Sequence, residues 1–180
     1  MEDVENLDTF SVTSDGRLLI PRNKPFDHIG VYDSDARLIH QIFLPTRASY
    51  PGHVVEKSNG NVVLSHNFSF SLSELNPDGR FVHRYRFRAR EGLLVFRGLL
   101  FNHFVLDTDE RVIAVNVNGQ EIVCIDPTLR RAEVITTEET SVVWPNRVHY
   151  DKTNSRLIVV GLDSVAFLDV LNPVTFNKSD

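Results

Sequence analysis

The chain has 180 residues, of which 42% are hydrophobic and 24% charged, with a formal net charge of −5 at pH 7. This composition supports a folded core and argues against both wholesale disorder and a generally basic nucleic-acid-binding protein. The single cysteine excludes an internal disulfide and a cysteine-rich zinc module. No run of about 18 apolar residues occurs, so no membrane span is expected. The acidic amino end without a signal stretch and the lack of disulfides predict a cytoplasmic protein.

A strand–turn–strand pattern recurs four times along the chain. Each copy has a short apolar segment, a polar turn, an Arg or Asn, and then three or four apolar residues. The copies cover 10–20, 54–64, 104–115 and 148–160. The residues that follow the turns are Arg17, Asn61, Arg111 and Arg156, at separations of 44, 50 and 45 positions.

A second landmark follows each of the first three copies. It is an apolar segment that ends in an Asp or Asn turn and another Arg, at 29–37, 72–80 and 122–130. The closing residues Arg37, Arg80 and Arg130 are 43 and 50 positions apart. Because the two landmarks shift together, they mark a repeated unit.

The repeated unit has the features of a propeller blade. Its segments are rich in β-branched and aromatic residues, and Asp-Gly and Asn-Gly between them supply the positive φ of tight hairpins. Four strands in about 40–45 residues are typical of a blade, which must stack on neighbours to bury its faces. We therefore predict an all-β fold, a single β-propeller domain over 1–180 with about four blades of four antiparallel strands, or the matching part of a six-bladed ring. The blade-like units are roughly 8–46, 50–90, 102–136 and 145–176.

The fourth unit is short of an outer strand. After the apolar segment 165–170 the chain meets Asn172-Pro173, and little sequence remains. Either Val174–Phe176 or Val4–Leu7 supplies the missing strand, or the edge stays open to pair with another chain. The best helical candidate, Glu91–Phe101, has consecutive apolar residues and is interpreted as an insertion plus a strand.

The second unit resembles a blade of the NHL type. It has Pro51-Gly52 at its start, Asn59-Gly60-Asn61 at its first turn and Asn76-Pro77-Asp78-Gly79-Arg80 at its last. The fourth unit, with Trp144-Pro145 and Asn154-Ser155-Arg156, resembles the last blade of tripartite-motif (TRIM-NHL) proteins. Those propellers usually have six blades, the third unit lacks the Pro and the turn Gly, and the RING, B-box and coiled-coil parts are absent from this sequence. The resemblance implies the substrate-recognition propeller of a ubiquitin ligase, which binds protein or RNA without ligase chemistry of its own.

Loops that join blades, and loops between the second and third strands of a blade, meet on one face of a propeller. Four polar residues align at the start of an innermost strand, where side chains ring the channel mouth: Thr9, His53, His103 and Arg147. The loops add Arg22, Arg47, Tyr50, His66, Phe68 and Trp144. Such a basic and aromatic surface on an acidic protein suits an acidic peptide or a phosphate backbone. The competing interpretation is that these are ordinary solvated loop residues.

Catalysis has no support in the pattern of residues. Two histidines on different blades are possible metal ligands, but no carboxylate aligns with them, so we predict neither a metal nor a cofactor. Cys124 lies in the apolar run 122–125, which predicts an unreactive core thiol. The sequence has no Gly-x-Ser-x-Gly elbow and no Gly-rich phosphate loop.

A basic strip forms the strongest local concentration of positive charge. It contains Arg84, Arg86, Arg88, Arg90 and Arg97, with Tyr85, Phe87 and Phe96 between them. The strip fits RNA or an acidic protein, or else an edge strand that charge keeps soluble. The leading hypothesis is a non-enzymatic propeller that recognises a protein partner through its loop face. The alternatives are single-stranded RNA binding and a metal-dependent lactonase-like hydrolase.

Overall fold

The structure is a computed structural model that describes residues 9–22, 28–45, 51–66, 71–86, 103–116, 121–135 and 145–169. These residues form strands and turns, with no helix among them, and hence none that could cross a membrane. The strands are β1 (Ser11–Val12), β2 (Leu18–Arg22), β3 (His28–Tyr32), β4 (Leu38–Phe43), β5 (Pro51–Glu56), β6 (Val62–His66), β7 (Ser71–Leu75), β8 (Phe81–Arg86), β9 (Phe104–Leu106), β10 (Val112–Asn116), β11 (Glu121–Ile125), β12 (Ala132–Val134), β13 (Arg147–Asp151), β14 (Arg156–Val160) and β15 (Val165–Asp169).

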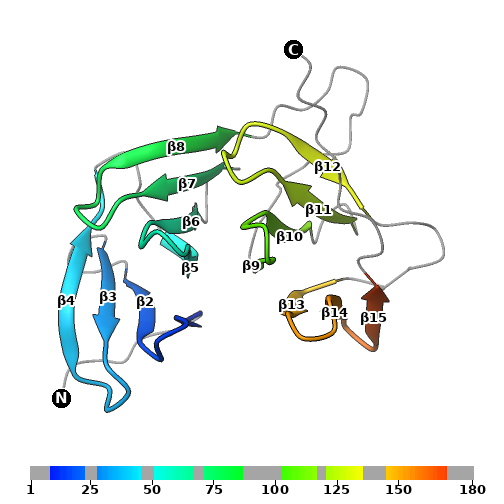
Figure 1. Ribbon diagram of the computed structural model, residues 1–180, viewed down its shortest axis with the longest axis horizontal. Helices are drawn as coiled ribbons and strands as arrows, with labels where there is room; N and C mark the ends of the chain where they lie inside the picture. Colours follow the sequence, from blue (N-terminus) through cyan, green and yellow to red (C-terminus); the bar gives the residue numbers. More distant parts are fainter. Residues whose placement is uncertain are drawn as a thin grey trace. The chain divides into compact units, whose positions relative to one another are not determined.

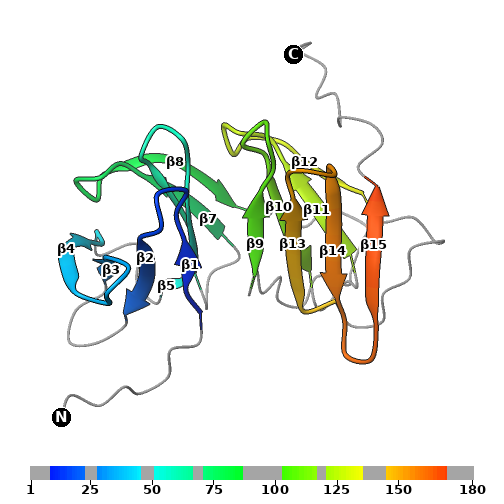
Figure 2. The same ribbon diagram turned by 60° about the horizontal axis from the view of Figure 1, so that its bottom comes forward.

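The strands form four sheets in which neighbours along the chain are neighbours in the sheet (Figure 1). The first three sheets have four strands each, β1–β4, β5–β8 and β9–β12. The fourth has three described strands, with β15 at its edge (Figure 2). The expected all-β fold of four antiparallel blade-like sheets is confirmed. The strand candidates Val4–Leu7 and Val174–Phe176, and the segment Glu91–Phe101, lie outside the described residues.

The chain divides into two compact units, Met1–Arg84 and Tyr85–Asp180. The first unit contains the sheets β1–β4 and β5–β8, except that the last two residues of β8 belong to the second unit. The second unit contains the sheets β9–β12 and β13–β15. Each unit therefore joins two sheets that follow each other in the chain.

One turn geometry explains the spacing of both sequence landmarks. In the turn before β4, Asp33 Oδ1 accepts hydrogen bonds from the backbone N–H groups of Asp35 at 3.0 Å and Arg37 at 2.8 Å. Asp107 Oδ1 does the same for Asp109 and Arg111, both at 2.9 Å. A short polar side chain that binds backbone N–H groups two and four positions ahead fixes a tight turn. The landmark Arg therefore ends the turn, and its hydrogen bond to the turn side chain fixes the register between the two strands that the turn joins.

The residue just before each landmark has the left-handed backbone conformation. It is glycine in three hairpins, at Gly16, Gly60 and Gly79, with φ between 77° and 85°. In the other four it is Ala36, Glu110, Leu129 and Ser155, with φ between 52° and 60°. Glycine adopts this conformation without steric cost, whereas the other residues are strained in it. The Asn-Gly and Asp-Gly turns were predicted, and the same turn forms without glycine as well.

Each unit buries an apolar core between its two sheets. The first core joins Leu19, Ile29, Val31 and Ile42 of the first sheet to Val54, Val62, Leu64 and Leu75 of the second. The second core joins Ile113, Val115 and Ile122 of the third sheet to Val148, Tyr150, Leu157 and Val159 of the fourth. Sheets that stack in this way bury faces that a single sheet would leave in water.

A glycine also sets how closely the first two sheets approach. A Cβ built on Gly79, in the turn before β8, would lie 2.2 Å from the backbone oxygen of Phe43, at the end of β4. No side chain fits there, and φ at this glycine is +77°. Both the space and the backbone conformation therefore require glycine at this position.

Candidate functional site

The antiparallel pairing places the start of each inner strand at the same sheet end as the loop between the second and third strands. In the second sheet Pro51 pairs with His66, the last residue of β6. In the fourth sheet Arg147 pairs with Val160, the last residue of β14. We call this the loop end of each sheet, and the opposite end, which carries the Asp and Asn turns, the turn end.

In the first unit, the inner strands of the two sheets are joined by a side chain. Thr9 Oγ1 donates a hydrogen bond to the backbone oxygen of Gly52 at 2.8 Å. The next residue, His53, is 3% exposed, and its backbone N–H donates to Ser65 Oγ at 2.8 Å. Two of the four aligned residues, Thr9 and His53, therefore lie together at the contact between neighbouring sheets.

In the second unit, the aligned histidine also bonds to inner-strand backbone of the next sheet. The backbone N–H of Val148, which follows Arg147, donates to His103 Nδ1 at 3.4 Å. The pKa of His103 is lowered to about 4. Burial of the ring is the largest cause, and electrostatic repulsion from Arg147 and His149 contributes to the same shift. The imidazole is therefore neutral at pH 7, as it must be for Nδ1 to accept this bond.

These two contacts give the sequence alignment a structural meaning. In both units, the residue that begins the inner strand of one sheet contacts inner-strand backbone of the next sheet. The side chains of Thr9 and His103 serve as tethers between sheets. Their proposed place in a ring around a channel mouth stays a prediction.

The loop end of the first unit also holds polar side chains next to aromatic and imidazole rings. Arg22 is half-buried and pairs across the sheet with the buried His28. His28 Nε2 lies 3.3 Å from Gln41 Nε2, and its ring centroid is 6.1 Å from that of Phe43. In the second sheet, His66 Nε2 lies 2.8 Å from Ser73 Oγ, and both residues are buried. The other predicted loop residues, Arg47, Tyr50, Phe68 and Trp144, lie outside the described part of the chain.

The described part of the basic strip lies on the outer strand β8. The Arg84 guanidinium carbon lies 5.8 Å from the centroid of the Phe81 ring, within the range of a cation–π contact. Phe81 and Val82 are exposed. Arg86 is the last residue of β8, and Arg88, Arg90 and Arg97 lie outside the described residues. This placement on an outer strand agrees with both interpretations of the strip.

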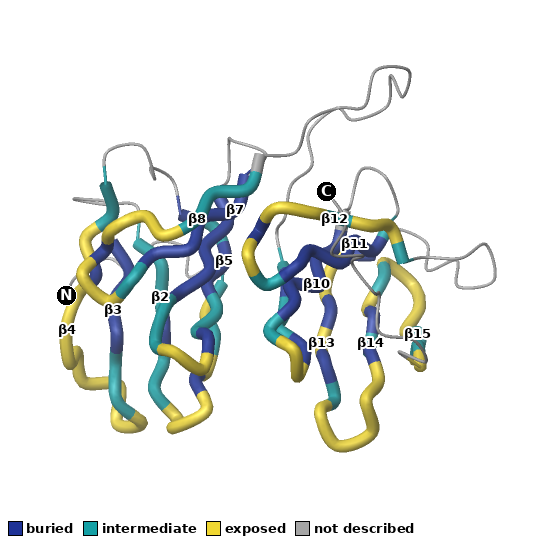
Figure 3. The backbone as a smooth tube through the Cα atoms, turned by 45° about the horizontal axis from the view of Figure 1, so that its top comes forward, coloured by how far each residue is buried: buried dark blue, intermediate teal, exposed yellow. Residues whose placement is uncertain are grey.

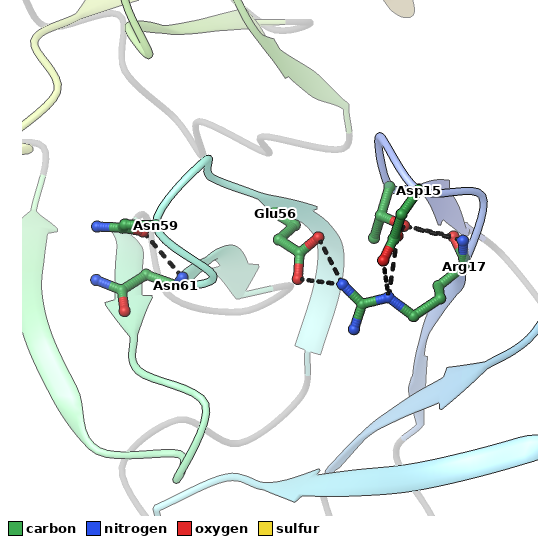
Figure 4. Close-up of polar contacts among 6 residues, drawn as sticks. Asp15, Arg17, Glu56, Asn59 and Asn61 are labelled. Carbon is green, nitrogen blue, oxygen red and sulfur yellow. Dashed lines mark hydrogen bonds and ion pairs between the residues drawn. The ribbon is translucent and has the colours of Figure 1, made fainter.

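Sequence reasoning missed an ion pair between the first two sheets. Arg17 Nε lies 2.8 Å from Asp15 Oδ2, and its Nη2 lies 3.1 Å from Glu56 Oε1 in the neighbouring sheet (Figure 4). Hydrogen bonds from Thr13 and then Arg17 hold the pKa of Asp15 at about 2. The landmark Arg of the first hairpin thus also connects two sheets, which its position after a turn did not reveal.

Two further ion pairs are buried at the turn end. Lys57 Nζ lies 3.3 Å from Glu74 Oε2, and Asn61 Nδ2 donates to Glu74 Oε1 at 2.7 Å. Arg111 Nε lies 2.5 Å from Asp107 Oδ2. Each pair compensates charges that would be costly to bury singly. In the sequence, these ion pairs are marked by nothing more than a charged residue at the boundary of a turn. An exposed turn has charged residues at the same place, so the sequence does not distinguish the two cases.

The buried thiol has the environment that the sequence predicted. Cys124 is 2% exposed, and burial raises its pKa to about 11, so the thiolate needed for nucleophilic attack is disfavoured. Among the described residues, no group of three or more His, Cys, Asp or Glu side chains is arranged to hold a metal ion.

The contacts described above place the loop-end side chains where they can donate and accept hydrogen bonds. Arg22 and Arg147 also carry positive charge there.

Comparison with solved structures identifies the fold. The chain is similar to a catalytically inactive virginiamycin B lyase from Staphylococcus aureus solved with quinupristin, at 13% identity and a TM-score of 0.59, over 94% of this chain and 59% of that one. It is similar to a protein of unknown function from Bacteroides caccae, at 13% identity and a TM-score of 0.60, over 96% of this chain and 60% of that one. It is also similar to a chain of the nidogen/laminin complex, at 14% identity and a TM-score of 0.65, over 89% and 59%.

These similarities assign the chain to the β-propeller fold, with the four sheets as blades. The chain spans about three fifths of the length of these solved structures. No protein-family model matches the sequence, and no curated protein matches it. At 13–14% identity, the similarity carries the fold alone.

Proposed function

We propose that this propeller is a non-enzymatic, cytoplasmic interaction module that binds a protein partner through the loop ends of its blades. The observation that carries the proposal is a pair of tethers, one from Thr9 Oγ1 to the backbone oxygen of Gly52 and one from the backbone N–H of Val148 to His103 Nδ1. In each unit, a tether holds the inner strands of two consecutive blades together at the loop end. The backbone that carries the polar side chains there is therefore held in a fixed position. A rigid frame reduces the entropy lost when a partner binds.

Two comparisons favour binding as the function. The resemblance of 50–80 to NHL blades favours a recognition propeller, as in the substrate-recognition part of tripartite-motif ligases. One structural neighbour was solved as part of a protein complex, that of nidogen and laminin. Another neighbour is a lyase, so the fold by itself is compatible with either class of function.

The experiment compares substitutions at the two ends of the blades. Proteins captured from a lysate by the intact chain are identified and purified, and each is then titrated against single variants. Arg22→Ala and Arg147→Ala alter the loop end, while Arg37→Ala and Arg80→Ala remove the same side chain from the turn end as matched controls. We expect weaker binding only for the first pair. Equal affinities for all four variants, or a loss confined to the turn-end pair, would refute the proposal.

A second candidate is single-stranded RNA binding along β8. It is favoured by the guanidinium of Arg84 over the ring of Phe81 on an outer strand, because cationic and aromatic groups together bind unpaired bases. Binding of a fluorescent oligouridine should then weaken steeply as salt rises, and Arg84→Gln should reduce the slope. Affinity that is independent of salt would remove this candidate.

A further inference from the structure

The inner strand of the fourth blade carries two basic side chains on one side. Exposed and buried residues alternate along β13 (Figure 3). Val148 and Tyr150 belong to the core of the second unit, so Arg147 and His149 lie on the opposite side of the strand, as alternate residues do. Both are exposed. Their Cα atoms are about 7 Å apart, because two residues of a strand span that length.

His103 contacts the backbone between these two side chains. The N–H of Val148, the residue between Arg147 and His149, donates to His103 Nδ1 at 3.4 Å. Burial, and then the positive charges of Arg147 and His149, lower the pKa of His103. Three basic side chains from two consecutive blades therefore surround one backbone N–H group.

The two ends of the fourth blade differ in how their charges are balanced. At the turn end, Arg156 Nε lies 2.6 Å from Asp169 Oδ1. At the loop end, Arg147 and His149 pair across the sheet with apolar residues of β14. Within the described part of the chain, neither of them forms an ion pair. The loop end of this blade therefore carries positive charge that no described carboxylate offsets.

The other charged groups around His103 are further away or bonded elsewhere. The strand that pairs with β9 does so through the apolar residues 112–114 of β10. Glu121 begins β11, two strands from β9, which is about 10 Å between strand axes. Asp151, at the turn end of β13, accepts a hydrogen bond from Asn154 Nδ2 at 2.7 Å. The charges that act on His103 are thus those of Arg147 and His149.

A proton on His103 changes the hydrogen bonding at this point. In the neutral ring Nδ1 accepts a hydrogen bond from Val148, whereas in the charged ring Nδ1 carries a hydrogen and can only donate. Nδ1–H and the N–H of Val148 then face each other as two donors. An acceptor with negative charge satisfies both donors and offsets the repulsion between His103, Arg147 and His149.

We propose that the loop end of the second unit is an oxyanion site, formed by Arg147, His149, the N–H of Val148 and the protonated ring of His103. The oxygens of a carboxylate or a phosphate group suit these donors. The anion and the proton bind together, because each makes the binding of the other more favourable. The inference rests on the proposed function only for the source of the anion, which is an acidic segment of the protein partner.

The first measurement is an NMR titration of the histidine side chains from pH 7 downward, in sodium sulfate and in sodium chloride of matched ionic strength. We expect sulfate to raise the pKa of His103 by at least about one pH unit, so that sulfate binds the protonated form at least about tenfold more tightly than the neutral form. His40, which is exposed on β4 of the first blade, should titrate alike in both salts. An unchanged pKa of His103, or an equal rise at His40, would overturn the inference.

Substitutions then test which side chains hold the anion. Arg147→Gln and His149→Gln each remove a positive donor, so each should raise the sulfate concentration that gives half of the effect on His103 at least about fivefold. Arg156→Gln is the matched control, since it removes a cation from the same side of the sheet where Asp169 already balances it. It should leave the response to sulfate unchanged. An equal loss in all three variants would show unspecific attraction and refute the site.

A peptide identifies the source of the anion. A tetra-aspartate peptide with blocked ends, added at pH 5, should protonate His103 as sulfate does, and Arg147→Gln should weaken its effect. If sulfate acts and the peptide does not, the site takes a free oxyanion and the acidic segment is wrong. Neither measurement needs the protein partner, so a failure with sulfate removes the oxyanion site alone. Partner binding that tolerates Arg22→Ala and Arg147→Ala removes the proposed function alone.

Discussion

The tether at His103 makes a quantitative prediction about stability in acid. The pKa of this imidazole is about 4 in the folded protein, against an ordinary value of 6.5. The unfolded chain therefore takes up a proton on this side chain at a higher pH than the folded chain does. Stability from this group is complete above about pH 6.5 and is lost as the pH falls toward 4.

The size of the effect follows from the displacement of the pKa. At about 1.4 kcal/mol for each pH unit, the full loss is about 3 kcal/mol, and partial exposure of the ring reduces it to about 2 kcal/mol. Protonation also removes the acceptor for the backbone N–H of Val148. His103→Asn keeps an acceptor at this position and does not titrate, so it isolates the effect of the proton.

The assay is urea unfolding of the intact chain and of His103→Asn between pH 7 and pH 4. Other groups, such as Asp15 and Asp151, have lowered pKa values and lose their own contributions in acid. They do so equally in both proteins, so the difference between the two pH profiles reports His103 alone. We expect the intact chain to lose about 2 kcal/mol more than the variant. Parallel profiles would show that His103 titrates normally in the folded protein and would refute the argument.

Three other substitutions test the packing of the blades, each by urea unfolding at pH 7. Gly79→Ala forces a Cβ against the backbone oxygen of Phe43 in a left-handed conformation, and should cost about 2–4 kcal/mol; an unchanged midpoint would mean that the two blades are not held at this distance. Ala36→Gly relieves a φ of 60° in an exposed turn and should stabilise the folded protein by up to about 1 kcal/mol. A midpoint no higher than that of the intact chain would mean that the turn is not strained in solution. Lys57→Met leaves the charge of Glu74, which is 2% exposed, without its cation and should cost about 3–5 kcal/mol. The double variant that also carries Glu74→Leu should recover most of that loss. If it does not, the loss caused by Lys57→Met does not come from the unpaired charge of Glu74.

The repeat could be predicted from the sequence because its strongest signals are local. Asp or Asn at a strand end, a residue with positive φ and then Arg or Asn are contiguous in the chain, and together they fix a hairpin. The prediction extended to the turns at Glu110 and Leu129, where the flanking residues preserve the pattern and the glycine is missing. In these turns the side chain of Asp107 or Asp126 binds the backbone N–H groups that follow.

The contacts between blades could not be predicted, because they join residues far apart in the chain. Arg17 and Glu56 are 39 positions apart, and nothing near either residue identifies the other as its partner. Whether Lys57 lies in water or is buried beside Glu74 depends on the pairing of three strands. The sequence did align Thr9 with His103, but only the structure shows that each side chain bonds to inner-strand backbone of the next sheet.

The meander within each sheet has a consequence for how such a chain changes over evolutionary time. Since every strand pairs with the strand next to it in sequence, a blade carries its own hydrogen bonds and its own turns. Duplication or deletion of one blade in the gene leaves the hairpins of the remaining blades intact and alters only which faces meet. A change in blade number therefore leaves the hydrogen bonds within each remaining blade unaltered.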